Sequence, residues 1–116
     1  MLHSITILER DPVIAQDIGE TLAELFPGVT VSLFSTLRDL CDALIMRAED
    51  AGLAVLHGTS DELRDPELAR LTALKRIRVV AIQSPTPEAA TEGWIFLPPP
   101  FTTPDLKAAL RRALDL

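Results

Sequence analysis

Five short apolar runs, separated by segments of helical periodicity, are the feature that most constrains what this chain can fold into. The runs span residues 4–8, 29–34, 53–56, 79–82 and 94–97. Four of them are continuously apolar, without the alternation of polar and apolar residues that marks a half-buried strand. Strands of this kind are buried on both faces, so they fit a parallel sheet that helices cover on both sides.

The segments between the runs carry apolar residues at the spacing of one helix face. We predict helices from Val13 to Phe26, from Leu37 to near Asp50–Gly52, from Pro66 to Leu74, and from a cap at Thr103 onward, with a polar loop at His57–Asp65. The expected inward stripes are Ile14, Ile18, Leu22 and Leu25 or Phe26; Leu37, Leu40, Cys41, Leu44 and Ile45; Leu68, Leu71 and Leu74; and Leu106, Leu110 and Leu114. Two prolines between residues 84 and 93 leave room for about one helical turn, so a fourth helix should be shortened.

Strand and helix therefore alternate five times within 116 residues. Parallel strands need crossover connections, which are right-handed in nearly all known cases. We predict an α/β fold with residues 1–116 as one domain: a flavodoxin-like (βα)5 three-layer sandwich around a central five-stranded parallel sheet. In such folds functional groups gather beyond the carboxyl ends of the strands.

Composition narrows the class of protein further. The single Cys41 cannot form an intramolecular disulfide, and with His3 and His57 as the only histidines there is no Cys/His set at metal-ligand spacing. No apolar run approaches the roughly 18 residues of a membrane span, and no signal peptide is recognisable. We expect a cytoplasmic protein without a membrane segment.

The net charge of −6 argues against a surface that binds nucleic acid directly. Its distribution is uneven, because residues 1–63 hold three basic and eleven acidic side chains, whereas residues 64–116 hold eight basic and six acidic ones. Neither a glycine-rich phosphate loop nor a GxSxG nucleophile turn is present. We therefore do not expect an enzyme.

Four segments, in order, carry a family resemblance: residues 5–12, 53–56, 79–84 and 99–101. Together they resemble the receiver domain of bacterial response regulators, of the chemotaxis-receiver type, over essentially the whole chain. That resemblance implies an acidic pair after the first strand, a phosphoacceptor Asp after the third, a Thr or Ser after the fourth, and a Lys before the final Pro-Phe. In that family, Mg²⁺ bound by the acids assists transfer of the phosphoryl group.

This sequence departs from the family pattern at most of those positions. In the acidic pocket, Glu9 matches the first acid, but Arg10 stands where the second should be, with Asp11 after it. The phosphoacceptor position is His57. The switch position is Gln83 or, after a one-residue slip, Ser84, and the position of the Lys is Pro99. We expect Arg10 to repel Mg²⁺ and to pair with Glu9 or Asp11, so a metal site and any other cofactor are expected to be lost.

Each polar residue near these positions can have a structural role instead of a functional one. His57 is expected to fill the former aspartate site and to bond Glu9 or a backbone carbonyl; the alternatives are a phosphorylated or pH-sensing imidazole, or a transition-metal ligand with Glu9 and Asp11. Asp11 is interpreted as a helix-start residue. A solvated turn with a helix cap is expected at Asp61, Glu62 and Asp65.

The resemblance implies an atypical receiver, or pseudo-receiver, that acts in signal transduction by protein–protein interaction without conventional aspartyl phosphorylation. The alternative is a phosphorelay regulator that is phosphorylated at His57, Ser84 or a carboxylate such as Asp61. A histidine kinase or an effector would be the partner. A homodimer through the last strand and helix is also possible in this view; the candidate partner face is Trp94, Phe96, Lys107, Arg111 and Arg112.

Overall fold

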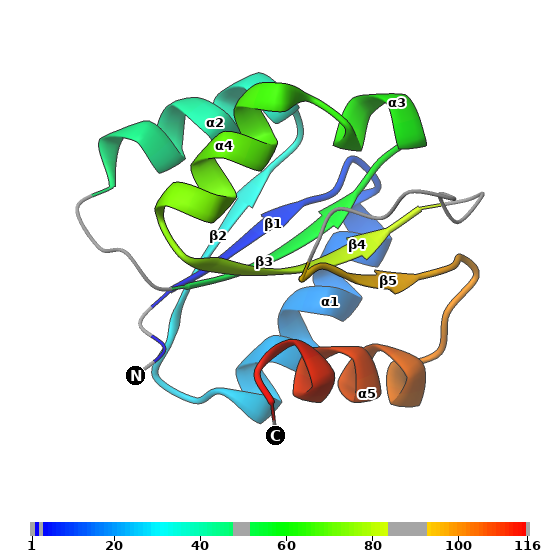
Figure 1. The fold of residues 1–116 in the computed structure, drawn as a ribbon. Coiled ribbons are helices and arrows are strands. Elements are labelled where there is room, and N and C mark those ends of the chain that lie inside the picture. Colours follow the sequence, from blue (N-terminus) through cyan, green and yellow to red (C-terminus); the bar gives the residue numbers. More distant parts are fainter. Residues whose placement is uncertain (1, 3, 48–51, 84–92, 116) are drawn as a thin grey trace.

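The computed structural model describes residues 2, 4–47, 52–83 and 93–115. Its centre is a five-stranded sheet, entirely parallel, in the order β2-β1-β3-β4-β5 (Figure 1). The strands are β1 (Ser4–Leu8), β2 (Thr30–Phe34), β3 (Gly52–His57), β4 (Ile77–Ile82) and β5 (Ile95–Leu97). The predicted five-stranded parallel sheet is confirmed.

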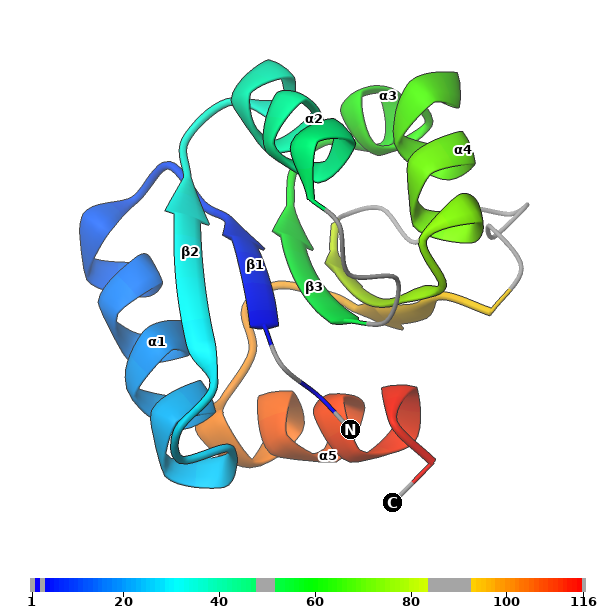
Figure 2. The ribbon, with the colours of Figure 1, turned by 90° about the vertical axis from the view of Figure 1, so that its left-hand side faces the viewer.

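Helices cover both faces of this sheet. They are α1 (Pro12–Leu25), α2 (Leu37–Met46), α3 (Ser60–Leu63), α4 (Pro66–Leu74) and α5 (Thr103–Ala113). Figures 1 and 2 show α1 and α5 on one face and α2, α3 and α4 on the other. The three-layer sandwich predicted from the sequence is therefore the observed architecture.

Two hydrophobic clusters fill the spaces between the sheet and its helices. One joins alternate residues of β1, β3 and β4, such as Ile7 and Val55, to Ile18 of α1 and Leu110 of α5. The other joins the opposite residues of the same strands to α2 and α4. Because β3 is buried on both faces, it tolerates no polar alternation, which explains its continuous apolar sequence. β1 is also buried on both faces but carries Ser4 and Thr6, and the Thr6 hydroxyl accepts a hydrogen bond from Arg47. The outer strand β2 is different: Val31 and Leu33 are exposed.

Side chains that accept backbone hydrogen bonds fix where the helices begin. Asp11 accepts from the amides of Val13 and Ile14, at 2.9 and 3.4 Å. Asp65 accepts from the first amides of α4. At α5, Thr102 and Asp105 form a reciprocal capping box. The cap of the last helix is therefore Thr102 and not Thr103, because only Thr102 has the extended backbone that turns its hydroxyl toward the amide three residues later.

Two other boundaries differ from the sequence prediction. Helix α2 ends at Met46, and its carboxyl cap Arg47 is already extended, so the predicted end near Asp50–Gly52 is wrong; Asp50 and Ala51 lie outside the described residues. The segment predicted as a loop from His57 to Asp65 contains α3, which Thr59 caps by accepting from the Glu62 amide. His57 itself is the last residue of β3.

Two apolar residues that the sequence assigns to inward-facing stripes are exposed instead. Ile45 of α2 and Leu74 of α4 are 51% and 64% exposed. Both lie in the last turn of their helix, to the side of the face that holds its buried residues, which are Leu40, Cys41 and Leu44 in α2 and Leu68, Leu71 and Thr72 in α4. The expected short helix between residues 84 and 93 falls on residues 84–92, outside the described residues.

Among the described residues, no helix is both long enough and apolar enough to cross a lipid bilayer.

Candidate functional site

The residues that follow β1 and β3 line an open recess of about 770 Å³ at the carboxyl edge of the sheet. Its described lining is Glu9, Arg10, Asp11, Ile14, His57, Gly58, Thr59, Glu62 and Pro99. The position follows from the topology, because the carboxyl ends of neighbouring parallel strands meet at one edge. The structure thus brings together five residues that the sequence places at the ends of strands: Glu9, Arg10, Asp11, His57 and Pro99.

Glu9 and His57 form the centre of the recess. Glu9 is only 5% exposed, and its Oε1 lies 2.5 Å from Nδ1 of His57. Its Oε2 accepts the backbone N–H groups of Arg10 and Asp11, at 2.9 and 3.2 Å. A buried carboxylate is costly unless its oxygens are hydrogen-bonded, so these three contacts explain how Glu9 is tolerated there.

The backbone of Glu9 also ties the site to the edge of the sheet. Its N–H donates to the carbonyl of Phe34 at the end of β2, at 3.0 Å. One residue after β1 therefore contacts β2 through its main chain and β3 through its side chain.

Arg10 pairs with Glu62, which α3 brings to the strand ends. The expected ion pair of Arg10 with Glu9 or Asp11 is wrong, because Glu9 is bonded to His57 and Asp11 caps α1. Gly58 leaves room for Glu62 in its observed position, because a Cβ at residue 58 would clash with Glu62 Oε1. Glu62 is thus not a residue of a solvated turn, whereas Asp65 is a helix cap as expected and Asp61 is exposed.

No protein-family model matches the sequence, and no curated protein matches it by sequence. Solved structures do match its fold. The solution structure of SdrG from Sphingomonas melonis Fr1 gives a TM-score of 0.70 at 21% identity, with 97% of each chain covered. The signal receiver domain of an HD domain-containing protein from Pseudomonas fluorescens Pf-5 gives 0.70 at 19% identity, over 99% of this chain and 96% of that one. The chain has the fold of a response-regulator receiver domain.

A third match is longer than this chain. A mutant of the anti-anti-sigma factor PhyR from Bartonella quintana gives a TM-score of 0.68 at 22% identity. The match covers 99% of this chain and 49% of PhyR, so the chain spans about half of that protein's length. These likenesses establish the receiver fold.

The receiver fold implies Mg²⁺ at the strand ends, and the residues of this site do not fit that ion. Mg²⁺ takes oxygen ligands in near-octahedral geometry. Here both oxygens of Glu9 are engaged, His57 offers nitrogen, and the guanidinium of Arg10 adds positive charge. In the described segments no three His, Cys, Asp or Glu side chains are grouped so that they could hold a metal ion.

The residues aligned with the Thr or Ser and with the Lys of the receiver family carry no charge. Gln83 is 4% exposed at the end of β4, and its alternative Ser84 lies outside the described residues. Pro99, at the position of the family's Lys, lines the recess with ring carbons and brings no cation.

The candidate partner face is divided by the structure. Trp94 and Phe96 are half-buried, with ring centroids 6.3 Å apart, and pack on the α2–α4 side of the sheet. Lys107 of α5 lies on the other side and donates to Glu24 of α1, at 3.1 Å. Only Arg111 and Arg112 of this set are exposed, so the five residues do not form one continuous exposed face.

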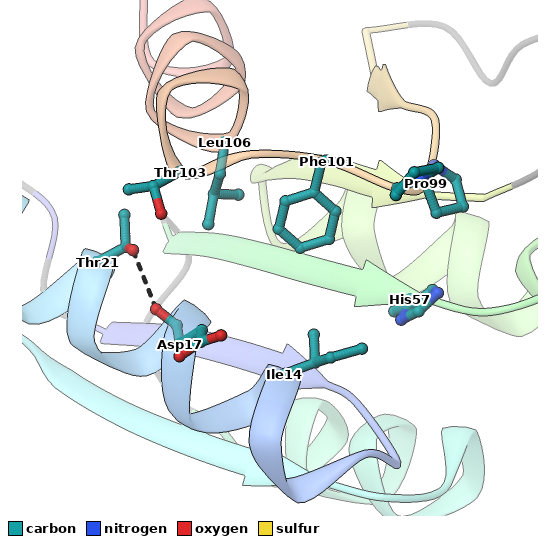
Figure 3. A pocket seen from close by; sticks show the side chains of 9 residues that line it. Ile14, Asp17, Thr21, His57, Pro99, Phe101, Thr103 and Leu106 are labelled. Carbon is teal, nitrogen blue, oxygen red and sulfur yellow. Dashed lines mark hydrogen bonds between the residues drawn. The ribbon is translucent and has the colours of Figure 1, made fainter.

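A second cavity adjoins the recess and was missed by the sequence analysis. It has a volume of about 530 Å³ and lies between α1, the start of α5 and the segment that joins β5 to α5 (Figure 3). Its described lining is Ile14, Asp17, Thr21, His57, Pro99, Pro100, Phe101, Thr103 and Leu106. Helical spacing does place Ile14, Asp17 and Thr21 on one side of α1, but only the crossing of α1 and α5 shows that this side borders a cavity.

Proposed function

We propose that this chain is an atypical receiver, a pseudo-receiver, that takes part in signal transduction through protein–protein contacts and without conventional aspartyl phosphorylation. The contact between His57 and Glu9 carries the proposal. It occupies the place where a conventional receiver would combine a phosphoacceptor Asp with an acid of the metal site. The protein would act by presenting a surface to a partner, as a binding domain and not as an enzyme.

Two further features support this proposal. The second acid is replaced by Arg10, whose charge is paired with Glu62. The position of the phosphate-binding Lys is Pro99, which carries no charge. Phosphoryl transfer depends on positive groups that offset the charge of the transferring oxygens; this site offers one guanidinium, and it is already held by a carboxylate.

A phosphodonor experiment tests the proposal. The ¹⁵N-labelled chain is mixed with millimolar Mg²⁺ and beryllofluoride, and in parallel with acetyl phosphate. We expect no saturable amide shifts at Glu9, Arg10, His57 and Gly58, and no gain of a phosphoryl group by intact-mass measurement. Mg²⁺-dependent shifts at these amides, or a phosphorylated carboxylate, would overturn it.

One observation favours a second candidate, a phosphorelay regulator modified at His57. A carboxylate oxygen accepts a hydrogen bond, so Nδ1 donates to Glu9, and in the neutral imidazole the lone pair then lies on Nε2. The imidazole is 26% exposed, and no hydrogen bond from a described residue reaches Nε2. That nitrogen could attack the phosphorus of a donor, forming an N–P bond as the donor's leaving group departs with its electron pair.

The same experiment separates the two candidates. Phosphohistidine is lost in acid and retained in alkali, whereas an acyl phosphate is labile in both. A phosphoryl group on the wild-type chain that is acid-labile, alkali-stable and absent from His57→Gln would establish the phosphorelay candidate. Asp61→Asn is the matched control, because Asp61 is exposed next to the site.

The partner is proposed to be a histidine kinase or an effector. A homodimer through β5 and α5 is the other arrangement that we propose to test. Sedimentation of the wild type against Arg111→Glu distinguishes them: a concentration-dependent dimer that this substitution weakens supports self-association.

A further inference from the structure

We propose that the cavity between α1 and α5 binds a small apolar molecule, best with a ring, that carries a protonated amine. Its volume of about 530 Å³ lies within the range of about 300–1,000 Å³ that small-molecule sites occupy. The inference is independent of whether the chain is phosphorylated, because the cavity lies beside the strand-end recess and shares only part of its wall.

The apolar part of the lining comes from two segments that are far apart in the sequence, α1 and residues 99–106. Figure 3 shows Ile14 of α1, Phe101 and Leu106 around one space, with Pro99 at its side. Phe101 is half-buried, so part of its surface remains available to a ligand. Burial of a ring against these side chains would supply most of the binding free energy, because it removes apolar surface from water.

The polar part of the lining selects the charge of the ligand. Asp17 of α1 borders the cavity, and its carboxylate forms no ion pair or hydrogen bond with another described residue. No lysine or arginine is among the described residues of the lining. The nearest amine of α5, on Lys107, is already bonded to Glu24. A carboxylate without a fixed counter-ion favours a cation over an anion.

Hydrogen-bond capacity also fits an amine. Thr21 donates its hydroxyl hydrogen to the carbonyl of Asp17, at 3.0 Å (Figure 3). The lone pairs of that hydroxyl remain able to accept, and they lie one helical turn from the Asp17 carboxylate. An ammonium group can donate to both because it carries three donors.

His57 connects this cavity to the strand-end recess, since it lines both. A bound molecule that contacts the imidazole would therefore alter the surroundings of the His57–Glu9 pair. Binding of such a molecule would be a signal to this atypical receiver that does not require phosphorylation.

The test uses three probes that share one ring and differ in charge: phenethylamine, 2-phenylethanol and phenylacetate. Each is titrated to millimolar concentration into the ¹⁵N-labelled chain. We expect saturable shifts at Ile14, Asp17, Thr21, Phe101 and Thr103, with phenethylamine binding tighter than 2-phenylethanol, and phenylacetate weakest. Absence of saturation at these amides, or equal affinity for phenethylamine and phenylacetate, would overturn the proposal.

Two variants of Asp17 test the role of the carboxylate. Asp17→Asn should weaken phenethylamine by about two- to fivefold, the size of one exposed ion pair, and leave 2-phenylethanol unchanged. Asp17→Lys should reverse the order of phenethylamine and phenylacetate. Glu20→Gln is the matched control: it removes the same charge from an exposed position of α1 that does not line the cavity. An equal loss in Glu20→Gln would contradict a role for Asp17 in the site.

Discussion

Nδ1 of His57 lies 2.5 Å from Oε1 of Glu9, a contact that joins the end of β3 to the residue after β1. Glu9 is buried, and its other oxygen is held by two backbone amides. His57 therefore supplies the side-chain partner of a buried carboxylate at the strand ends.

Removing the imidazole should destabilise the fold. In His57→Ala, Glu9 Oε1 loses its side-chain partner in a buried setting, which costs about 1–3 kcal/mol. Urea unfolding monitored by circular dichroism measures the change. Adding Glu9→Gln to His57→Ala should recover part of the loss, because an uncharged amide is cheaper to bury; additive losses in the double variant would contradict direct coupling of the two residues.

A single substitution should not create a Mg²⁺ site. In His57→Asp, Arg10 still places a cation at the recess and Pro99 still offers none for a phosphate. We expect Mg²⁺-dependent amide shifts only in the triple variant Arg10→Asp, His57→Asp and Pro99→Lys. If His57→Asp alone binds Mg²⁺ at millimolar concentration, the electrostatic effect of Arg10 has been overestimated.

The two glycines Gly58 and Gly19 should respond oppositely to alanine. At Gly58 the new Cβ would meet Glu62 Oε1, the flexible end of a side chain, so Glu62 should move and release Arg10 at a cost below about 1 kcal/mol. At Gly19, inside α1, a Cβ meets nothing within 4 Å, so Gly19→Ala should stabilise by about 0.5–1 kcal/mol. Thermal unfolding measures both, and a stabilised Gly58→Ala would be the unexpected result.

The cap of α5 provides a test at a different place. Thr102→Ala removes the hydroxyl that accepts from the Asp105 amide, at 3.2 Å, and should cost about 1 kcal/mol. Thr103→Ala, one residue later, is the control and should change the free energy of unfolding by much less. Equal effects at the two threonines would mean that the capping box contributes little.

Cys41 should alkylate slowly in the folded chain. Burial, followed by the nearby carboxylates of Asp65, Glu67 and Asp42, raises the pKa of the Cys41 thiol. The reactive thiolate is then scarcer at a given pH than in the unfolded chain. We expect iodoacetamide to react several-fold more slowly with native protein than with urea-unfolded protein between about pH 7 and 9, and equal rates would show that the thiol is accessible.

The sheet and its covering helices could be predicted because each strand and helix carries its own periodicity. What escaped prediction depends on contacts between elements. Arg10 was expected to pair with a sequence neighbour, but Glu62 reaches it because a four-residue helix interrupts an apparently polar loop. Ile45 continues the apolar stripe of α2, yet it is exposed at the edge of the buried face that Leu40 and Leu44 form. The cavity beside Phe101 arises from the crossing of two helices, which no local pattern records.

Glu9 is the point at which three strands meet: its main chain extends β1, its amide holds the end of β2, and its carboxylate holds the end of β3. A change in the contacts of His57 can therefore affect the outer strand β2 through two hydrogen bonds, from His57 to Glu9 and from Glu9 to Phe34. The carbonyl of Phe34 is a natural place to observe it. An isotope label at that one carbonyl would therefore report, from the edge strand of the sheet, on what occupies the recess at the strand ends.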